Sequence, residues 1–216
     1  ADSSAAALYE VFMRVFVRRA FEGELGGLTE RYMGKGPEAP LAVHGVFGFR
    51  AWERVLTMLI EDGGGDRIGR LVEKSLGEAI EFLEKRLGRN RKKWSWGRLH
   101  TLAFTHLLGR VKPLRKFFDR GVYRTGGDGN TIWAQFCSMH DLNMSAQIGP
   151  PFRFVADLSD LGGSVGVLVP GQSGVPSSPH YDDQIRDWLS GRYHRMAHRG
   201  REREGKGRRT LELLPG

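Results

Sequence analysis

A serine flanked by glycines is the first candidate for chemistry in this sequence. Gly171-Gln172-Ser173-Gly174 follows an apolar run that ends at Val169, as the nucleophile of a serine hydrolase would. The turn that presents such a nucleophile has the pattern Gly-x-Ser-x-Gly and leads into a helix. Here Val175 occupies the last glycine position, and prolines follow at positions 176 and 179. We therefore interpret the segment as a structural turn.

The glycine-rich stretch Gly126-Gly127-Asp128-Gly129-Asn130-Thr131 is a second candidate. Asp128 and Asn130 match the first two ligand positions of a calcium loop. Ile132 stands at the third position, and the Gly-Lys-Ser/Thr end of a phosphate-binding loop is missing. The pattern is more typical of a turn in which Asp and Asn side chains bond to nearby backbone. We expect no calcium at this turn.

Three residues at four-residue spacing, His194, His198 and Glu202, could form one face of a helix. Two histidines and one glutamate are a ligand set of catalytic zinc. The arginines interspersed among them oppose a divalent cation. A small metal-dependent hydrolase is therefore a minor alternative, which stoichiometric zinc would support.

The remaining acid–base and nucleophile candidates have structural interpretations. His180, Asp182 and Asp183 could form an acid–base set, but the two aspartates are adjacent, so on a helix they would point about 100° apart and could not act as a facing pair. Helix capping explains these residues more simply. Cys137, with His140 nearby, is expected to be buried rather than nucleophilic. The sequence thus contains no self-contained active site, and we assign no catalytic, cofactor-binding or metal-binding residue.

Basic residues are concentrated in two segments, Lys85–Arg98 and Arg192–Arg209, in a chain of formal net charge +8. Such segments could bind nucleic acid, and a basic nucleic-acid-binding module is the alternative function that we keep. Trp94 and Trp96 are expected to cover the edge of a core rather than to stack on bases. Nucleic acid is therefore the less favoured partner.

The overall composition excludes several classes of protein. Hydrophobic residues make up 40% of the 216 residues, which excludes a wholly disordered chain. Apolar stretches are all interrupted before about 18 residues, so we expect no membrane-spanning segment. The single cysteine excludes an internal disulfide framework and any multi-cysteine zinc site.

Helices are predicted in the first part of the chain. Apolar residues recur at helical spacing from Leu8 to Phe16, opposite Glu10, Arg14 and Arg18, after candidate caps at residues 2–4. A loop is expected at residues 34–40 and a second helix through 52–59. A third helix should start at Asp66 as its cap and end at Gly88, with Lys85 and Arg86 in its last turn.

Short strands are predicted in the second part, at residues 99–105, 131–136, 152–158 and 165–169. A further helix should begin at Ser178 and end at Gly191. Helices followed by strands indicate an α+β fold. We divide the chain into a helical segment (1–92), a strand-rich segment (93–191) and a basic tail (192–216), all within one larger domain.

Six motifs, in this order, resemble the carboxy-terminal part of penicillin acylase-type amidases. They are Trp94-x-Trp96-Gly97-x-Leu99-His100, Phe118-Asp119-Arg120-Gly121, Gly126-Gly127-Asp128-Gly129-Asn130-Thr131, Phe152-Arg153-Phe154-Val155-Ala156-Asp157-Leu158-Ser159-Asp160, Pro170-Gly171-Gln172-Ser173-Gly174 and Ser178-Pro179-His180-Tyr181-Asp182-Asp183-Gln184. The match spans residues 94–190. Leu107-Leu108 stands where many members have His-Pro, and the arginine-rich tail is unusual.

This resemblance implies the carboxy-terminal portion of a four-layered αββα N-terminal-nucleophile hydrolase. In that family a serine freed by precursor cleavage attacks an amide, and it would lie upstream of this chain, which begins Ala-Asp-Ser-Ser and looks like a piece of a longer protein. Implied partners are the remainder of the precursor and a small-molecule amide. Calcium is possible in the full-length protein but not in this segment, and family members are often periplasmic or secreted.

The motif residues are expected to complete the sheets and to hold the core that supports the site. Those expected to have this structural role are Trp96, His100, Arg120, Gly121, Gly127, Asp128, Asn130, Asp157, Gly171, Gln172, Ser173, Gly174, His180, Tyr181, Asp182 and Gln184.

Overall fold

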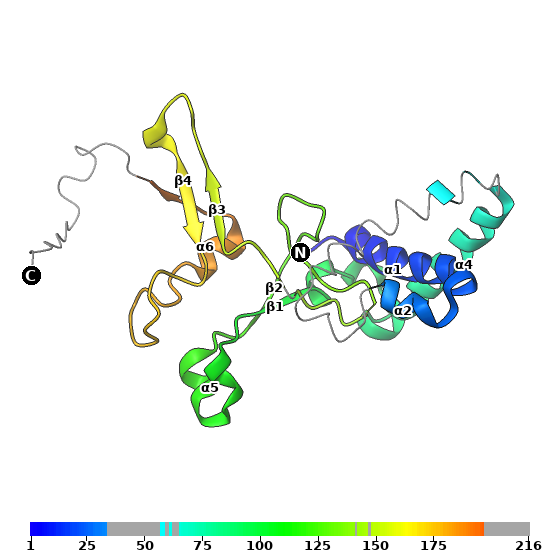
Figure 1. Ribbon diagram of the computed structural model, residues 1–216, viewed down its shortest axis with the longest axis horizontal. Coiled ribbons are helices and arrows are strands. Elements are labelled where there is room, and N and C mark those ends of the chain that lie inside the picture. The colour runs from blue at the N-terminus through cyan, green and yellow to red at the C-terminus, as the bar shows by residue number, and fades with distance from the viewer. Residues whose placement is uncertain (34–56, 59–60, 62–64, 141, 147, 197–216) are drawn as a thin grey trace, which may run out of the picture. The chain divides into compact units, whose positions relative to one another are not determined.

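A computed structural model of the chain describes residues 1–33, 57–58, 61, 65–140, 142–146 and 148–196 (Figure 1). It divides into two compact units, Ala1–Gly149 and Pro150–Gly216, and each is described by itself. The expected loop at 34–40, almost all of the expected helix through 52–59, and the tail beyond residue 196 lie outside the described residues. The division at residues 92 and 191 stays a prediction.

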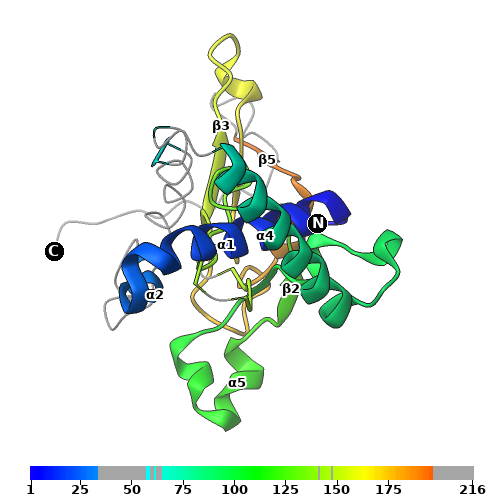
Figure 2. The same ribbon diagram turned by 90° about the vertical axis from the view of Figure 1, so that its right-hand side faces the viewer.

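Two long helices form the first part of unit 1, as the apolar periodicity predicts. Helix α1 spans Ser4–Leu25, and the hydroxyl of its cap Ser3 accepts a hydrogen bond from the backbone N–H of Ala6. A 3₁₀ turn (Gly26–Leu28) and the short helix α2 (Thr29–Tyr32) follow. Both views show the second long helix, α4 (Gly65–Leu87), crossing α1, against which it packs (Figures 1 and 2).

Helix α4 spans Gly65–Leu87. Asp66 lies inside its first turn and not at the cap, which corrects the prediction, although a carboxylate there still faces the positive end of the helix. Lys85 and Arg86 occupy the last turn, and Gly88 follows with φ +93°, a conformation that glycine adopts without strain. The end of this helix is therefore confirmed.

The helices bury two connected sets of apolar side chains. One set joins α1 and α4 to the segment that follows them and contains Ala7, Val11, Ala79, Leu83, Trp94, Trp96, Leu99, Cys137 and Met144. The other lies along the second half of α1 and contains Phe16, Val17, Ala20, Phe21, Met33 and Met139. The first set supports the polar groups described below.

A two-stranded antiparallel ribbon completes the described part of unit 1. Strand β1 (Thr101–Ala103) pairs with β2 (Val122–Arg124), with Leu102 opposite Tyr123. Two 3₁₀ turns, Arg91–Lys93 and Trp96–Arg98, precede the ribbon. A third 3₁₀ turn (Leu107–Arg110) and helix α5 (Lys112–Phe118) lie between its strands.

The strand predicted at residues 131–136 is wrong. These residues form turns, and only an isolated bridge joins Phe136 to Ile148. The hydroxyl of Thr131 accepts a hydrogen bond from the backbone N–H of Asp128, and Ile132 is fully exposed. The local side-chain bonds compete with a sheet ladder here, so the apolar residues do not alternate between a core and solvent.

Unit 2 contains a three-stranded antiparallel sheet in the order β3-β4-β5. Strand β3 (Phe152–Val155) and β4 (Val165–Leu168) form a hairpin with a 3₁₀ turn at Leu161–Gly163, and β5 (His194–Arg195) pairs with β4. Helix α6 (Ile185–Ser190) precedes β5 and ends at Gly191, which has φ +72°. The observed helices and short strands are compatible with the predicted α+β class.

Two expectations for unit 2 need correction. The helix predicted to start at Ser178 starts only at Ile185, because the Ser178 hydroxyl accepts from the His180 N–H and closes a turn instead of capping a helix. His194 lies on strand β5 and not on a helix. It therefore cannot belong to the helical face that was expected to contain His194, His198 and Glu202. His198 and Glu202 lie outside the described residues.

Within the described ranges, no helix combines the length and hydrophobicity needed to cross a bilayer.

Candidate functional site

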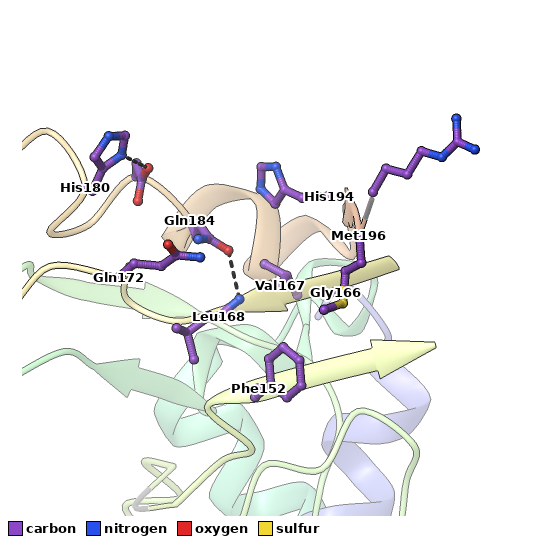
Figure 3. Close-up of a pocket in the computed structure, with 11 residues that line it drawn as sticks. Phe152, Gly166, Val167, Leu168, Gln172, His180, Gln184, His194 and Met196 are labelled. Atoms are coloured by element: carbon purple, nitrogen blue, oxygen red, sulfur yellow. Dashed lines mark hydrogen bonds and ion pairs between the residues drawn. The ribbon is translucent and has the colours of Figure 1, made fainter. Parts of the chain in front are cut away.

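A cavity of about 360 Å³ lies in unit 2, between the sheet and the segment that leads to α6 (Figure 3). Five of the residues singled out in the sequence line it: Gln172, His180, Asp183, Gln184 and His194. Phe152 of β3 lies across from Gln172, His180 and Gln184. The side-chain Oε1 of Gln184 accepts a hydrogen bond from the Leu168 N–H at 2.8 Å, which fixes the segment to β4. The cavity is therefore lined by residues from three of the six motifs, those that contain Phe152, Gln172 and His180.

The Gly171–Gly174 segment is a tight turn beside this cavity. The backbone N–H of Ser173 donates to the carbonyl oxygen of His180 at 2.9 Å, and the Ser173 hydroxyl accepts from the Val175 N–H at 3.1 Å. The hydroxyl is thus used within the turn, as the missing elbow pattern led us to expect.

Replacing Gly171 by alanine is expected to lower the free energy of unfolding by about 2–3 kcal/mol. A β-carbon at this position would overlap the carbonyl oxygen of His180, which is backbone and cannot move aside alone. Guanidinium unfolding followed by tryptophan fluorescence measures the effect. Gly174→Ala is the matched control, since a β-carbon there meets nothing within 4 Å, and an equal loss in both variants would contradict the explanation.

The other candidates of this segment have ordinary partners. The imidazole Nδ1 of His180 lies 2.9 Å from a carboxylate oxygen of Asp183, in an exposed pair. Tyr181 is buried, and the backbone carbonyl of Asp182 accepts from the N–H of Ile185. Both aspartates precede α6, so their expected placement on a helix is wrong. The His180 imidazole therefore has a carboxylate partner from its own segment.

Arg153 and Asp157 organise the hairpin of unit 2. The Arg153 guanidinium lies 4.0 Å from the ring centre of Trp188 and donates to the Trp188 carbonyl at 2.8 Å. A carboxylate oxygen of Asp157 accepts from the hydroxyl and N–H of Ser159 and from the N–H of Asp160. These bonds lower the pKa of Asp157 because they favour its charged form. Asp157 is therefore suited to shape the hairpin loop.

In unit 1 Trp96 and His100, which are four residues apart, come together with Gly127, which is 31 positions from Trp96. The indole N–H of Trp96 donates to the Gly127 carbonyl at 2.7 Å, and the Trp96 ring stacks on His100 with ring centres 4.6 Å apart. His100 is fully buried, and its Nδ1 donates to the carbonyl of Met144 at 2.7 Å. Burial lowers the pKa of His100 to about 4, so the imidazole is neutral near pH 7.

The glycine-rich turn at Gly126–Thr131 forms as predicted. A carboxylate oxygen of Asp128 accepts from the Asn130 N–H at 2.5 Å. Gly127 has φ +74°, and a β-carbon there would overlap the carbonyl of Trp133. Arg120 and Gly121 lie at another backbone crossing, where the Arg120 N–H donates to Phe104 and the Phe104 N–H donates to Gly121.

A buried charged group beneath α1 was missed from the sequence. Glu10 and Arg14, expected on the polar side of the helix, are only 6% and 1% exposed. A guanidinium nitrogen of Arg14 lies 2.8 Å from a Glu10 carboxylate oxygen, and another donates to the sulfur of Cys137 at 2.8 Å. An i, i+4 Glu–Arg pair is ordinarily exposed on a helix surface. The sequence spacing of Glu10 and Arg14 therefore does not predict that they are buried.

Burial raises the pKa of both acidic members of this group, Glu10 and Cys137, against the opposing effect of Arg14. The Cys137 side chain therefore favours the thiol form, which is a poor nucleophile. The prediction that Cys137 is buried rather than nucleophilic is confirmed for its burial. The group is suited to holding α1 on the core.

The tryptophans of the first basic segment are covered. Trp94 and Trp96 are 4% and 2% exposed, and the indole N–H of Trp94 donates to the Gly88 carbonyl. Their rings cannot stack on bases, which confirms that they cover the core. In the described part of the chain, no cluster of three or more His, Cys, Asp or Glu side chains is placed to hold a metal ion.

Comparison with known proteins identifies the family. The penicillin amidase family model matches residues 1–205. The acyl-homoserine lactone acylase QuiP of Pseudomonas aeruginosa is 31% identical over 89% of this chain, and the chain covers 24% of that protein. The penicillin acylase 2 proenzyme of Pseudomonas sp. strain SE83 is 31% identical over 87% of the chain, which covers 23% of it. The chain thus spans about a quarter of the length of these relatives, and it belongs to the penicillin amidase family.

Proposed function

We propose that this chain is the carboxy-terminal part of an amidohydrolase that cleaves the amide C–N bond of an N-acyl substrate, such as an acyl-homoserine lactone or a β-lactam antibiotic. The observation that carries the proposal is the family match over residues 1–205, together with relatives named as acylases of these two kinds. The nucleic-acid alternative loses the aromatic rings that it would have used, since Trp94 and Trp96 are buried.

The proposed reaction uses a serine that lies upstream of this chain and becomes the first residue of a processed polypeptide. Its hydroxyl oxygen forms a bond to the amide carbonyl carbon, and its own α-amino group takes the hydroxyl proton. The C–N bond then breaks, the amine leaves with that proton, and water hydrolyses the acyl-serine ester. A backbone N–H and an asparagine side chain, both upstream, would stabilise the oxyanion.

The contacts of three candidate groups in this chain support the proposal that the catalytic residues lie upstream. The Ser173 hydroxyl closes a turn, His100 is buried against Trp96, and the Cys137 sulfur accepts from Arg14. Each would need to leave its partner before it could take part in acyl transfer. We propose that the chain instead completes a four-layered αββα fold around a site formed mainly by the upstream segments.

The test compares the chain alone with the longer polypeptide that also contains the segments encoded upstream. Only the longer polypeptide is expected to release homoserine lactone from N-decanoyl-homoserine lactone or an amine from a chromogenic acyl anilide. An amine-reactive fluorescent reagent measures the product. Alanine at the proposed first serine is the control, and we expect a loss of at least about a thousandfold in kcat/KM.

Three outcomes would contradict the proposal in different ways. Turnover by the isolated chain would overturn the upstream placement of the nucleophile. Inactivity of the processed longer polypeptide toward both substrates would overturn the hydrolase assignment. Undiminished activity in the serine variant would overturn the mechanism while leaving the activity in place.

A further inference from the structure

The segment between strands β1 and β2, residues 105–120, forms a small ordered body that we call the excursion. It contains the 3₁₀ turn Leu107–Arg110 and helix α5, and both views show it extending away from helices α1 and α4 (Figures 1 and 2). A carboxylate oxygen of Asp119 accepts from the His106 N–H at 2.9 Å, and the rings of His106 and Phe118 stack at 4.8 Å. Its shape is thus held by its own contacts.

A glycine lies in the core of the excursion. A β-carbon at Gly109 would overlap the carboxylate of Asp119, and Gly109 is buried. Arg115 closes the same body, since its Nε donates to the Gly109 carbonyl at 3.3 Å and lies 3.8 Å from Asp119. These internal contacts hold the backbone of the excursion in one conformation, and they therefore fix the positions of its exposed side chains.

That outer surface is apolar where a solvated loop would be polar. Leu107 is 74% exposed, and Val111 and Phe117 are each 53% exposed. Leu108 beside them is also exposed. Single exposed apolar residues are ordinary, but several gathered on one small body are typical of an interaction surface.

The excursion is also strongly basic. Between residues 105 and 120 there are five Lys or Arg residues and one acidic residue, Asp119, so the excursion accounts for +4 of the net charge of the chain. Asp119 is turned inward, because it accepts from His106 and meets Gly109. Lys112 and Lys116 are exposed, and the Lys116 ammonium lies 5.0 Å from the centre of the exposed Phe117 ring. Positive charge and apolar surface are therefore adjacent there.

We propose that the excursion docks into an apolar groove rimmed by acidic side chains on the upstream part of its own precursor. The proposal rests on the proposed function, which requires such an upstream part. The chain covers only 24% of the relative from Pseudomonas aeruginosa and 23% of the penicillin acylase 2 proenzyme, so a protein of that length has ample further surface to cover the excursion. Charge complementarity selects an acidic groove, and Leu107, Val111 and Phe117 supply the apolar contact.

The test places the photoreactive residue p-benzoyl-phenylalanine at position 117 of the longer polypeptide that contains the upstream segments. Irradiation followed by proteolysis and mass spectrometry is expected to give a cross-link to an upstream peptide that contains Asp or Glu. The double variant Lys112→Glu/Lys116→Glu should reduce this cross-link about fivefold or more by charge repulsion. Arg70→Glu/Lys74→Glu, with the same change of charge on the exposed side of α4, is the matched control and should leave it unchanged.

The other occupants of this surface are separate outcomes. A cross-link only to a second copy of the protein, or to vesicles that contain phosphatidylglycerol, would overturn the proposal, and so would the absence of any cross-link. Hydrolysis is measured in the same samples. A cross-link without hydrolysis would reject the proposed function alone, whereas hydrolysis without a cross-link would reject the docking surface alone.

Discussion

Replacing Arg14 by methionine is expected to lower the free energy of unfolding by about 3–5 kcal/mol, because it leaves the Glu10 carboxylate buried without its counter-ion. Arg14 is 1% exposed and also donates to the sulfur of Cys137. Methionine keeps much of the side-chain volume, so the effect reports the loss of charge more than the loss of packing. Guanidinium unfolding followed by tryptophan fluorescence measures it.

Two further variants separate the buried charge from other causes. Arg91→Met removes an exposed arginine that lies 3.5 Å from Glu84, and it should cost less than about 1 kcal/mol. Glu10→Gln combined with Arg14→Met removes both charges and should recover part of the loss. If Arg14→Met cost no more than Arg91→Met, the Glu10–Arg14 pair would not stabilise the fold.

Acidification is expected to destabilise the protein through His100. Its pKa is about 4 in the folded chain, against about 6.5 when exposed, so the unfolded chain binds the proton more tightly. The stability that depends on neutral His100 is fully present above about pH 6.5 and is lost as the pH falls toward 4. The loss is as large as about 3 kcal/mol, and unfolding curves recorded from pH 7 to pH 4 measure it.

Asparagine is the informative substitution at this position. The Nδ1–H of His100 donates to the Met144 carbonyl, and the amide of Asn can donate in the same place without titrating. The Nε2 of His100 is buried and has no hydrogen-bond partner among the described residues, so a second proton there would be an unpaired charge. His100→Asn should therefore flatten the pH dependence between 6.5 and 4. An unchanged slope would assign that dependence to other groups.

Helix boundaries in unit 1 follow from local sequence. The Ser3 cap, the apolar spacing of α1 and the stop at Gly88 each act within a few residues, so they can be recognised without the fold. Residues 131–136 show the limit of the same reasoning. Their composition favours a strand, but side-chain bonds of Asp128 and Thr131 form turns instead, and a strand needs a partner that composition cannot supply.

The candidate site was predicted less completely, because burial is a property of the whole fold. The turns at Gly126–Thr131 and Gly171–Gly174 were recognised from residues that bond to their neighbours. The contact between Arg14 and Cys137 joins residues 123 positions apart, and nothing in the spacing of Glu10 and Arg14 distinguishes it from an exposed pair. The cavity in unit 2 likewise depends on the distance between β4 and the segment at Gln184.

The position of Cys137 makes its thiol a probe of local opening in the core between α1 and α4. It is the single cysteine of this chain, and its thiol lies under the Arg14 guanidinium in the core that joins α1 to α4. A thiol-specific reagent can reach it only during a local opening of that core, so the labelling rate at fixed pH counts such openings. Burial keeps the thiol unreactive while the core is closed, so its labelling rate measures how often α1 and α4 separate.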